Sequence, residues 1–105
     1  MLLLTKANRK ALPKLYANEN LPASEAVAIV KFFTPDGGWT FYASEFDGED
    51  TFFGYVVSGI DPSFSELGYF SFAKLTDARG PLGLPIERDR HFTPTKLGEI
   101  SDVRL

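Results

Sequence analysis

Hydrophobic residues gather in four short runs through the middle of the chain, and turn-forming residues separate each run from the next. The runs are residues 27–34, 39–44, 51–58 and 67–71, and all are rich in β-branched and aromatic side chains. The separating segments 35–38, 45–50 and 59–63 contain Pro, Gly, Asp or Ser, which are typical of tight turns. Successive strands joined by short turns pair antiparallel, so the pattern predicts a four-stranded antiparallel meander.

Short helices are predicted at both ends of this sheet, where they cover one of its faces. Thr5 is placed to cap a helix over residues 6–15, which Pro13 should end near residue 12 because proline is costly inside a helix. Ser71 can cap a helix over 72–78, and Thr95 can cap a last short helix through residue 100. The fold class expected is therefore α+β, as a single domain over residues 1–105.

A long Pro/Gly segment over residues 79–94 follows the second predicted helix. It also carries the apolar residues Leu82, Leu84, Ile86 and Phe92, which a disordered linker rarely contains. We therefore expect an ordered loop pinned to the domain, and ordered loops of this length are often functional. Its predicted structural residues are Gly80, Pro81, Gly83, Pro85, Glu87, Asp89 and His91.

Composition excludes several kinds of site. The chain has no cysteine and one histidine, so disulfides, thiolate chemistry, cysteine-bound zinc and a His-rich metal site are excluded, and no cofactor is predicted. The apolar start, residues 1–4, is too short for a signal peptide or a membrane span. We expect a cytoplasmic protein without a membrane partner.

The net charge of -3 is unevenly distributed. Residues 1–14 carry four basic residues, whereas residues 15–69 carry nine acids and the single base Lys31. An acidic middle disfavours nonspecific nucleic-acid binding over that part of the surface. The ten Phe, four Tyr and one Trp could stack single-stranded bases, but without interleaved bases they are better interpreted as core.

Two charged clusters are candidate sites. Glu45, Asp47, Glu49 and Asp50 surround Gly48 in a predicted acidic turn, which could bind a protein partner, hold a hard cation or be a solvated hairpin tip. Residues 87–91 combine Glu87, Arg88, Asp89, Arg90 and His91, which could supply acid–base groups or tie the long loop to the sheet by ion pairs. Arg88 and Arg90 are the predicted anchors for a partner in this second cluster.

Several segments together resemble one protein family. They are Val30-Lys-Phe-Phe-Thr-Pro35, Trp39-Thr-Phe-Tyr-Ala43, Phe52-Phe-Gly-Tyr-Val56, Leu67-Gly-Tyr-Phe70, Arg79-Gly-Pro-Leu-Gly-Leu-Pro-Ile-Glu-Arg-Asp89, and shorter matches near the N-terminus. In combination they resemble the bacterial domain-of-unknown-function family 2958. The resemblance implies carriage on plasmids, phages and integrative elements, and neighbours of antirestriction type; it assigns no catalytic residue.

Three functional hypotheses follow. The first is a non-enzymatic interaction module of a mobile element, for example an antirestriction or anti-CRISPR type inhibitor, whose partner is a host or mobile-element protein. The second is a DNA-binding accessory, supported by the basic N-terminal segment and the loop arginines. The third is an enzyme that uses Glu87, Asp89 and His91. The acidic middle and the lack of a catalytic motif favour the first.

Overall fold

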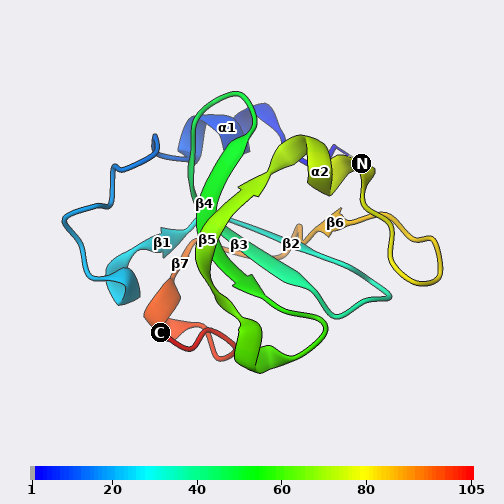
Figure 1. Ribbon diagram of the computed structural model, residues 1–105. Helices are drawn as coiled ribbons and strands as arrows, with labels where there is room; N and C mark the ends of the chain where they lie inside the picture. Colours follow the sequence, from blue (N-terminus) through cyan, green and yellow to red (C-terminus); the bar gives the residue numbers. More distant parts are fainter. Residues whose placement is uncertain (1) are drawn as a thin grey trace.

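A five-stranded antiparallel sheet organises the protein, whose computed structural model describes residues 2–105 (Figure 1). The strand order is β5-β4-β3-β2-β6. Its strands are β2 (Val30–Phe33), β3 (Thr40–Phe46), β4 (Thr51–Val57), β5 (Glu66–Ser71) and β6 (Glu87–Arg88). The predicted α+β class and the meander from β2 to β5 are confirmed. This sheet has one strand more than the predicted four, because Arg88 and Glu87 of the long loop pair with Phe32 and Phe33 on the free edge of β2.

A second, two-stranded sheet was not predicted, and it changes the structure at both of the segments that form it. The expected strand over residues 27–34 divides into β1 (Val27–Ala28) and β2, and β1 pairs instead with β7 (Thr95–Lys96). The helix expected from residue 95 is therefore absent from the described chain. A single 3-10 turn, η3 (Leu97–Glu99), follows β7. The amide of Leu97 donates to the carbonyl of Ala26 at 2.9 Å, which extends the pairing of the two segments beyond Thr95 and Lys96.

Both remaining helices begin where the capping residues predict. Thr5 caps α1 (Lys6–Ala11), and its hydroxyl accepts from the Asn8 amide at 3.0 Å. Ser71 caps α2 (Phe72–Asp77) in the same way. Two further 3-10 turns, η1 (Ala23–Glu25) and η2 (Pro62–Phe64), lie in connections. No helix within residues 2–105 has the length and apolar character needed to cross a membrane.

Both α-helices pack on one face of the sheet, as predicted, and the C-terminal segment covers the other face. The first face packs against Leu4, Leu12 and Leu75, which lie on or beside α1 and α2. The aromatic residues at its centre include Phe52, and the centroid of the Phe52 ring lies 4.4 Å from the centroid of the Phe46 ring.

The second face is covered by the C-terminal segment, which Figure 1 shows at the lower end of the sheet, away from α1 and α2. Tyr42 of β3 donates its hydroxyl to Asp102 at 2.7 Å. Tyr55 of β4 both donates to and accepts from the backbone of Arg104. These bonds hold the end of the chain against this face.

A β-bulge at Ser44 decides which face each residue at the end of β3 occupies. Ala43 pairs with Gly54 and Glu45 pairs with Phe53, so Ser44 is an extra residue in β3. A shift of one residue moves every later side chain to the opposite face of a sheet. Phe46 consequently joins the first core, and Glu45 lies on the second face. The predicted turn over residues 45–50 is therefore too long, since β3 continues through Phe46.

Candidate functional site

A cavity of about 250 Å³ opens on the second face, between the segment that follows α1 and the strands β3 to β5. Aromatic and aliphatic side chains form most of its wall. Its polar members are the carboxylates Glu19 and Glu45, the amide of Asn18, the hydroxyl of Ser44 and the phenols of Tyr16 and Tyr69. We call this cavity the Glu45 pocket, because its most buried charged group is the side chain of Glu45.

Glu45 is 5% exposed, although it carries a carboxylate. Its Oε1 accepts the Tyr16 amide at 2.8 Å, and its Oε2 accepts the Asn18 amide at 2.9 Å. Within residues 2–105, no basic side chain lies within the 4.0 Å of an ion pair with this carboxylate. Buried carboxylates are normally paired with a cation. The carboxylate of Glu45 is therefore bonded to backbone amides and has no cationic partner in the described part of the chain.

The segment that bonds to Glu45 is itself strained. Tyr16 has a φ of 71°, and no other residue except glycine has a positive φ in the described part of the chain. For a residue with a side chain this conformation costs about 1–2 kcal/mol. Nearby, Nδ2 of Asn18 is buried and has no hydrogen-bond partner among residues 2–105. Strain and an unpaired buried donor in one place are typical of functional sites.

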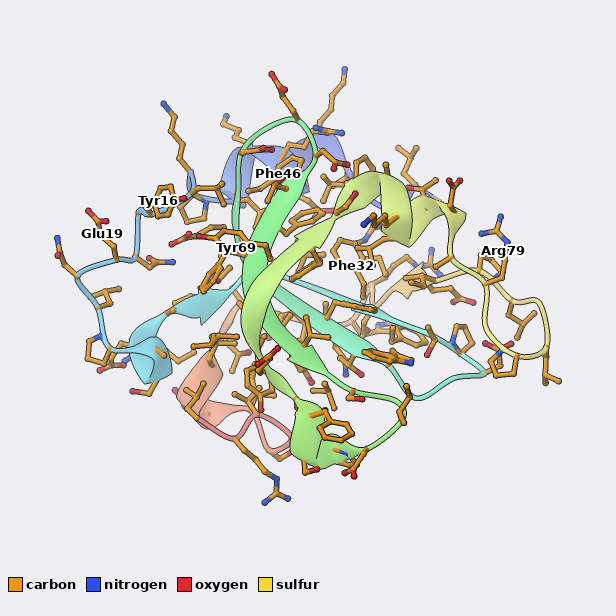
Figure 2. The ribbon with its side chains drawn as sticks, viewed as in Figure 1. Tyr16, Glu19, Phe32, Phe46, Tyr69 and Arg79 are labelled. Atoms are coloured by element: carbon orange, nitrogen blue, oxygen red, sulfur yellow. The ribbon has the colours of Figure 1, made fainter. Side chains whose placement is uncertain are left out.

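Two exposed tyrosines stand at the mouth of the pocket. Figure 2 shows Tyr16 on the segment after α1 and Tyr69 on β5, on the same side of the molecule. The two residues are 61% and 56% exposed, and their hydroxyl oxygens are 3.5 Å apart. The bond to Tyr16 raises the pKa of Tyr69, because a hydroxyl that donates is held in its neutral form. Both rings present aromatic surface to solvent beside the buried carboxylate.

The predicted acidic cluster is not one surface, because Glu45 is buried and apart from the rest. At the tip of the hairpin, Oδ1 of Asp47 accepts the amides of Glu49, Asp50 and Thr51 at 2.8–3.0 Å. These bonds lower the pKa of Asp47.

Asp50 has a separate structural role, since its two carboxylate oxygens accept from Ser71 and from the Ala73 amide at the start of α2. Glu49 is exposed at the tip. Within residues 2–105, no group of three or more potential metal ligands is present.

The long loop is ordered by backbone bonds to Asp36. Oδ2 of Asp36 accepts the amides of Leu82 and Leu84 at 2.8 and 3.4 Å. A Cβ placed on Gly80 would lie 1.6 Å from Oδ1 of Asp36, so any larger residue there would have to displace that carboxylate.

The apolar residues contribute less to the loop than predicted. Leu82 is 81% exposed and Ile86 is 8% exposed, so only part of the apolar set anchors the loop. Pro81 and Gly83 lie at its exposed tip, and Pro85 closes it by a backbone bridge to Arg79.

Residues 87–91 attach this loop to the sheet. Asp89 forms an ion pair with Lys31 at 3.8 Å and accepts the His91 amide at 2.9 Å. Arg88 donates to the carbonyl of Leu2, and Glu87 pairs with β2. Arg90 and His91 are exposed. None of these residues lines the Glu45 pocket.

Sequence reasoning missed Tyr16, Asn18 and Tyr69 as site residues. The first two lie in a segment whose turn composition carries no sign of a pocket. One signal was present: apolar residues fall at Phe41, Ala43 and then Phe46, which breaks the alternation of a strand. That break marks the bulge that places Glu45 on the second face.

Comparison with known proteins assigns the chain to a family and to nothing more specific. No curated protein and no solved structure matches the chain. The sequence model of one family, described as "Protein of unknown function (DUF2958)", matches residues 3–102. That match covers nearly the whole chain and agrees with the segments that suggested the family. The chain therefore belongs to the DUF2958 family.

Proposed function

We propose that this domain is a non-enzymatic interaction module that binds a partner protein at the Glu45 pocket. The observation that carries this proposal is the buried carboxylate of Glu45, without a basic partner among residues 2–105, beneath the two exposed tyrosines. Exposed tyrosines around a buried polar group are characteristic of protein-binding hot spots, since the rings supply contact area at little entropic cost.

The contacts of the other candidate groups support binding over catalysis. Catalysis requires acid and base groups that converge on a space for substrate. Asp89 is bonded to Lys31 and to the backbone of His91, and Glu87 lies in a strand pair. Both oxygens of Glu45 already accept backbone amides, so the carboxylate is held in place as a hydrogen-bond acceptor.

The family resemblance extends the proposal to a biological setting. A protein of a plasmid, phage or integrative element acts in the cytoplasm of its host, where host nucleases are available partners. Residues 15–69 carry nine acids against one base, and this net negative charge attracts the basic groups with which such enzymes bind nucleic acid. We therefore propose a host defence enzyme as the class of partner.

Affinity capture from host lysate tests the proposed function. Tagged wild-type protein is compared with Tyr69→Thr, which removes one ring at the pocket mouth and keeps a strand-forming residue. The matched control is Phe64→Ser, since Phe64 is 69% exposed on η2 and does not line the pocket. Each capture is repeated after nuclease treatment, and the proteins are identified by mass spectrometry.

The proposal predicts a defined protein that survives nuclease, is lost with Tyr69→Thr and is retained with Phe64→Ser. Two results would count against it. Retention of every captured protein by Tyr69→Thr would remove the pocket from the interaction. Recovery only of proteins that disappear after nuclease treatment would favour the DNA-binding accessory instead.

A further inference from the structure

We infer that the Glu45 pocket receives one arginine side chain of a partner polypeptide, an inference that rests on the proposed function. The pocket is the single place on the second face where a cavity, a buried charge, an unpaired donor and exposed aromatic rings occur together in residues 2–105. Size, charge and hydrogen-bonding capacity each restrict what it can hold.

The size of the cavity restricts the ligand to about one side chain. Its volume of about 250 Å³ lies below the range of ~300–1,000 Å³ in which sites for larger organic ligands fall. The wall is mostly apolar, and it includes Phe53 and Leu67 from β4 and β5. A side chain with an apolar stem and a polar end fits such a space, because its stem contacts the wall and its end reaches the base.

The charge of the cavity requires a cationic end. Glu45 is buried at the base, Glu19 lies at the edge, and no Lys, Arg or His is among the residues that line it in the described chain. A ligand cation would supply the partner that a buried carboxylate ordinarily has. The acidic composition of residues 15–69 would also raise the local concentration of basic segments.

The chemistry of the pocket favours a guanidinium over an ammonium group. A guanidinium is planar, is more weakly hydrated and stacks on aromatic rings, whereas an ammonium is compact and strongly hydrated. Tyr16 and Tyr69 offer rings at the mouth, and each oxygen of Glu45 keeps one acceptor position beyond its backbone bond. A guanidinium already packs on aromatic rings elsewhere in this protein, where Cζ of Arg9 lies 5.5 Å from the ring centres of Phe46 and Phe72.

The arginine is assigned to a polypeptide because the proposed function is the binding of a partner protein. Nδ2 of Asn18 is buried and has no partner among residues 2–105, so in this structure it lies out of reach of a ligand and does not select among ligands.

A peptide titration followed by ¹H–¹⁵N NMR tests this inference. The probe is N-acetyl-arginine-N-methylamide, which contains the side chain and two flanking carbonyls. The matched ligand is the corresponding citrulline compound, which has nearly the same shape without the charge, and the lysine compound is the third. All three are added to the full chain at equal ionic strength.

The inference predicts that the arginine compound shifts the amide signals of Tyr16 and Asn18, which bond to Glu45. The citrulline compound should bind at least about tenfold more weakly, since a charge-assisted bond is roughly twice as strong as a neutral one. Tyr69→Thr should abolish the shifts at the pocket, and Phe64→Ser should leave them unchanged.

Several results would overturn it. They are equal affinity for arginine and citrulline, affinity for lysine equal to or above that for arginine, shifts confined to the hairpin tip at residues 47–50, and no shift with any compound. Any of these can occur while Tyr69→Thr still loses its captured protein. In that case the proposed function stands and the arginine inference fails.

Discussion

Gly54 and Gly68 are directly opposite each other on β4 and β5, yet the chain crowds only one of them. A Cβ on Gly54 would lie 1.8 Å from the carbonyl oxygen of Tyr42 in β3. A Cβ on Gly68 would meet nothing within 4 Å. Gly54 pairs with Ala43, the residue immediately before the bulge that directs Glu45 into its pocket. The backbones of β3 and β4 therefore approach closely at Gly54, directly beside the bulge that places Glu45 in the candidate site.

This pair gives a matched stability prediction. Gly54→Ala should lower the free energy of unfolding by about 1–3 kcal/mol, the usual cost of forcing an added methyl group into a packed interior. Gly68→Ala should leave it unchanged or raise it by up to ~1 kcal/mol, since alanine restricts the unfolded chain. Urea unfolding of both variants measures the difference, and equal values would show that β3 does not approach β4 as described.

The bond between Asp36 and the long loop gives a second prediction. Gly80→Ala would force the Asp36 carboxylate away, so the amides of Leu82 and Leu84 should lose their protection from hydrogen exchange. The control is Gly83→Asn: Gly83 has a φ of 82° and open space around it, and asparagine tolerates this conformation. Equal protection in the two variants would mean that Asp36 does not order the loop.

Asp47 should make the hairpin tip sensitive to acid. Its folded pKa is lowered by three backbone amides, so the stability that it contributes is present above its unfolded pKa of about 3.9. That contribution is lost as the pH falls through the folded pKa. Asp47→Ala should therefore melt at a lower temperature than wild type at pH 7, and the gap should narrow toward pH 2. A gap that is independent of pH would assign the effect to something other than this carboxylate.

Tyr16 is expected to lower the stability of the folded protein while its ring contributes to binding at the pocket. Tyr16→Gly removes the strain of a positive φ, worth about 1–2 kcal/mol, and loses the side chain of a residue that is 61% exposed. The melting temperature should therefore stay level or rise while binding at the pocket is lost. Tyr16→Phe, which keeps the ring, should retain binding. A Tyr16→Gly variant that binds as well as wild type would exclude this ring from the site.

Local signals predicted the parts of the fold that depend on nearby residues. Thr5 and Ser71 cap their helices as expected, and the turn around Gly37 joins β2 to β3. The remainder depends on partners distant in sequence. Glu87 and Thr95 join strands only because β2 and β1 leave an edge for them, and no local pattern carries that information.

The candidate site was the least predictable part, because it depends on one extra residue in a strand. Without the bulge at Ser44, Glu45 would lie on the face of Ala43 and belong to the first core. Sequence reasoning selected Glu45 for its charge and assigned it to an exposed turn. Its burial beside Tyr16 follows from the register between β3 and β4.

The central claim is that a partner protein binds by placing an arginine side chain in the Glu45 pocket. A competition experiment during capture tests it most directly, because it asks whether a ligand that fills the pocket releases the partner. The captured complex is washed with increasing N-acetyl-arginine-N-methylamide or with its citrulline counterpart at equal ionic strength, and the retained protein is quantified. The account predicts release by the arginine compound at concentrations where the citrulline compound releases none. Equal release by both compounds, or none by either, would contradict it.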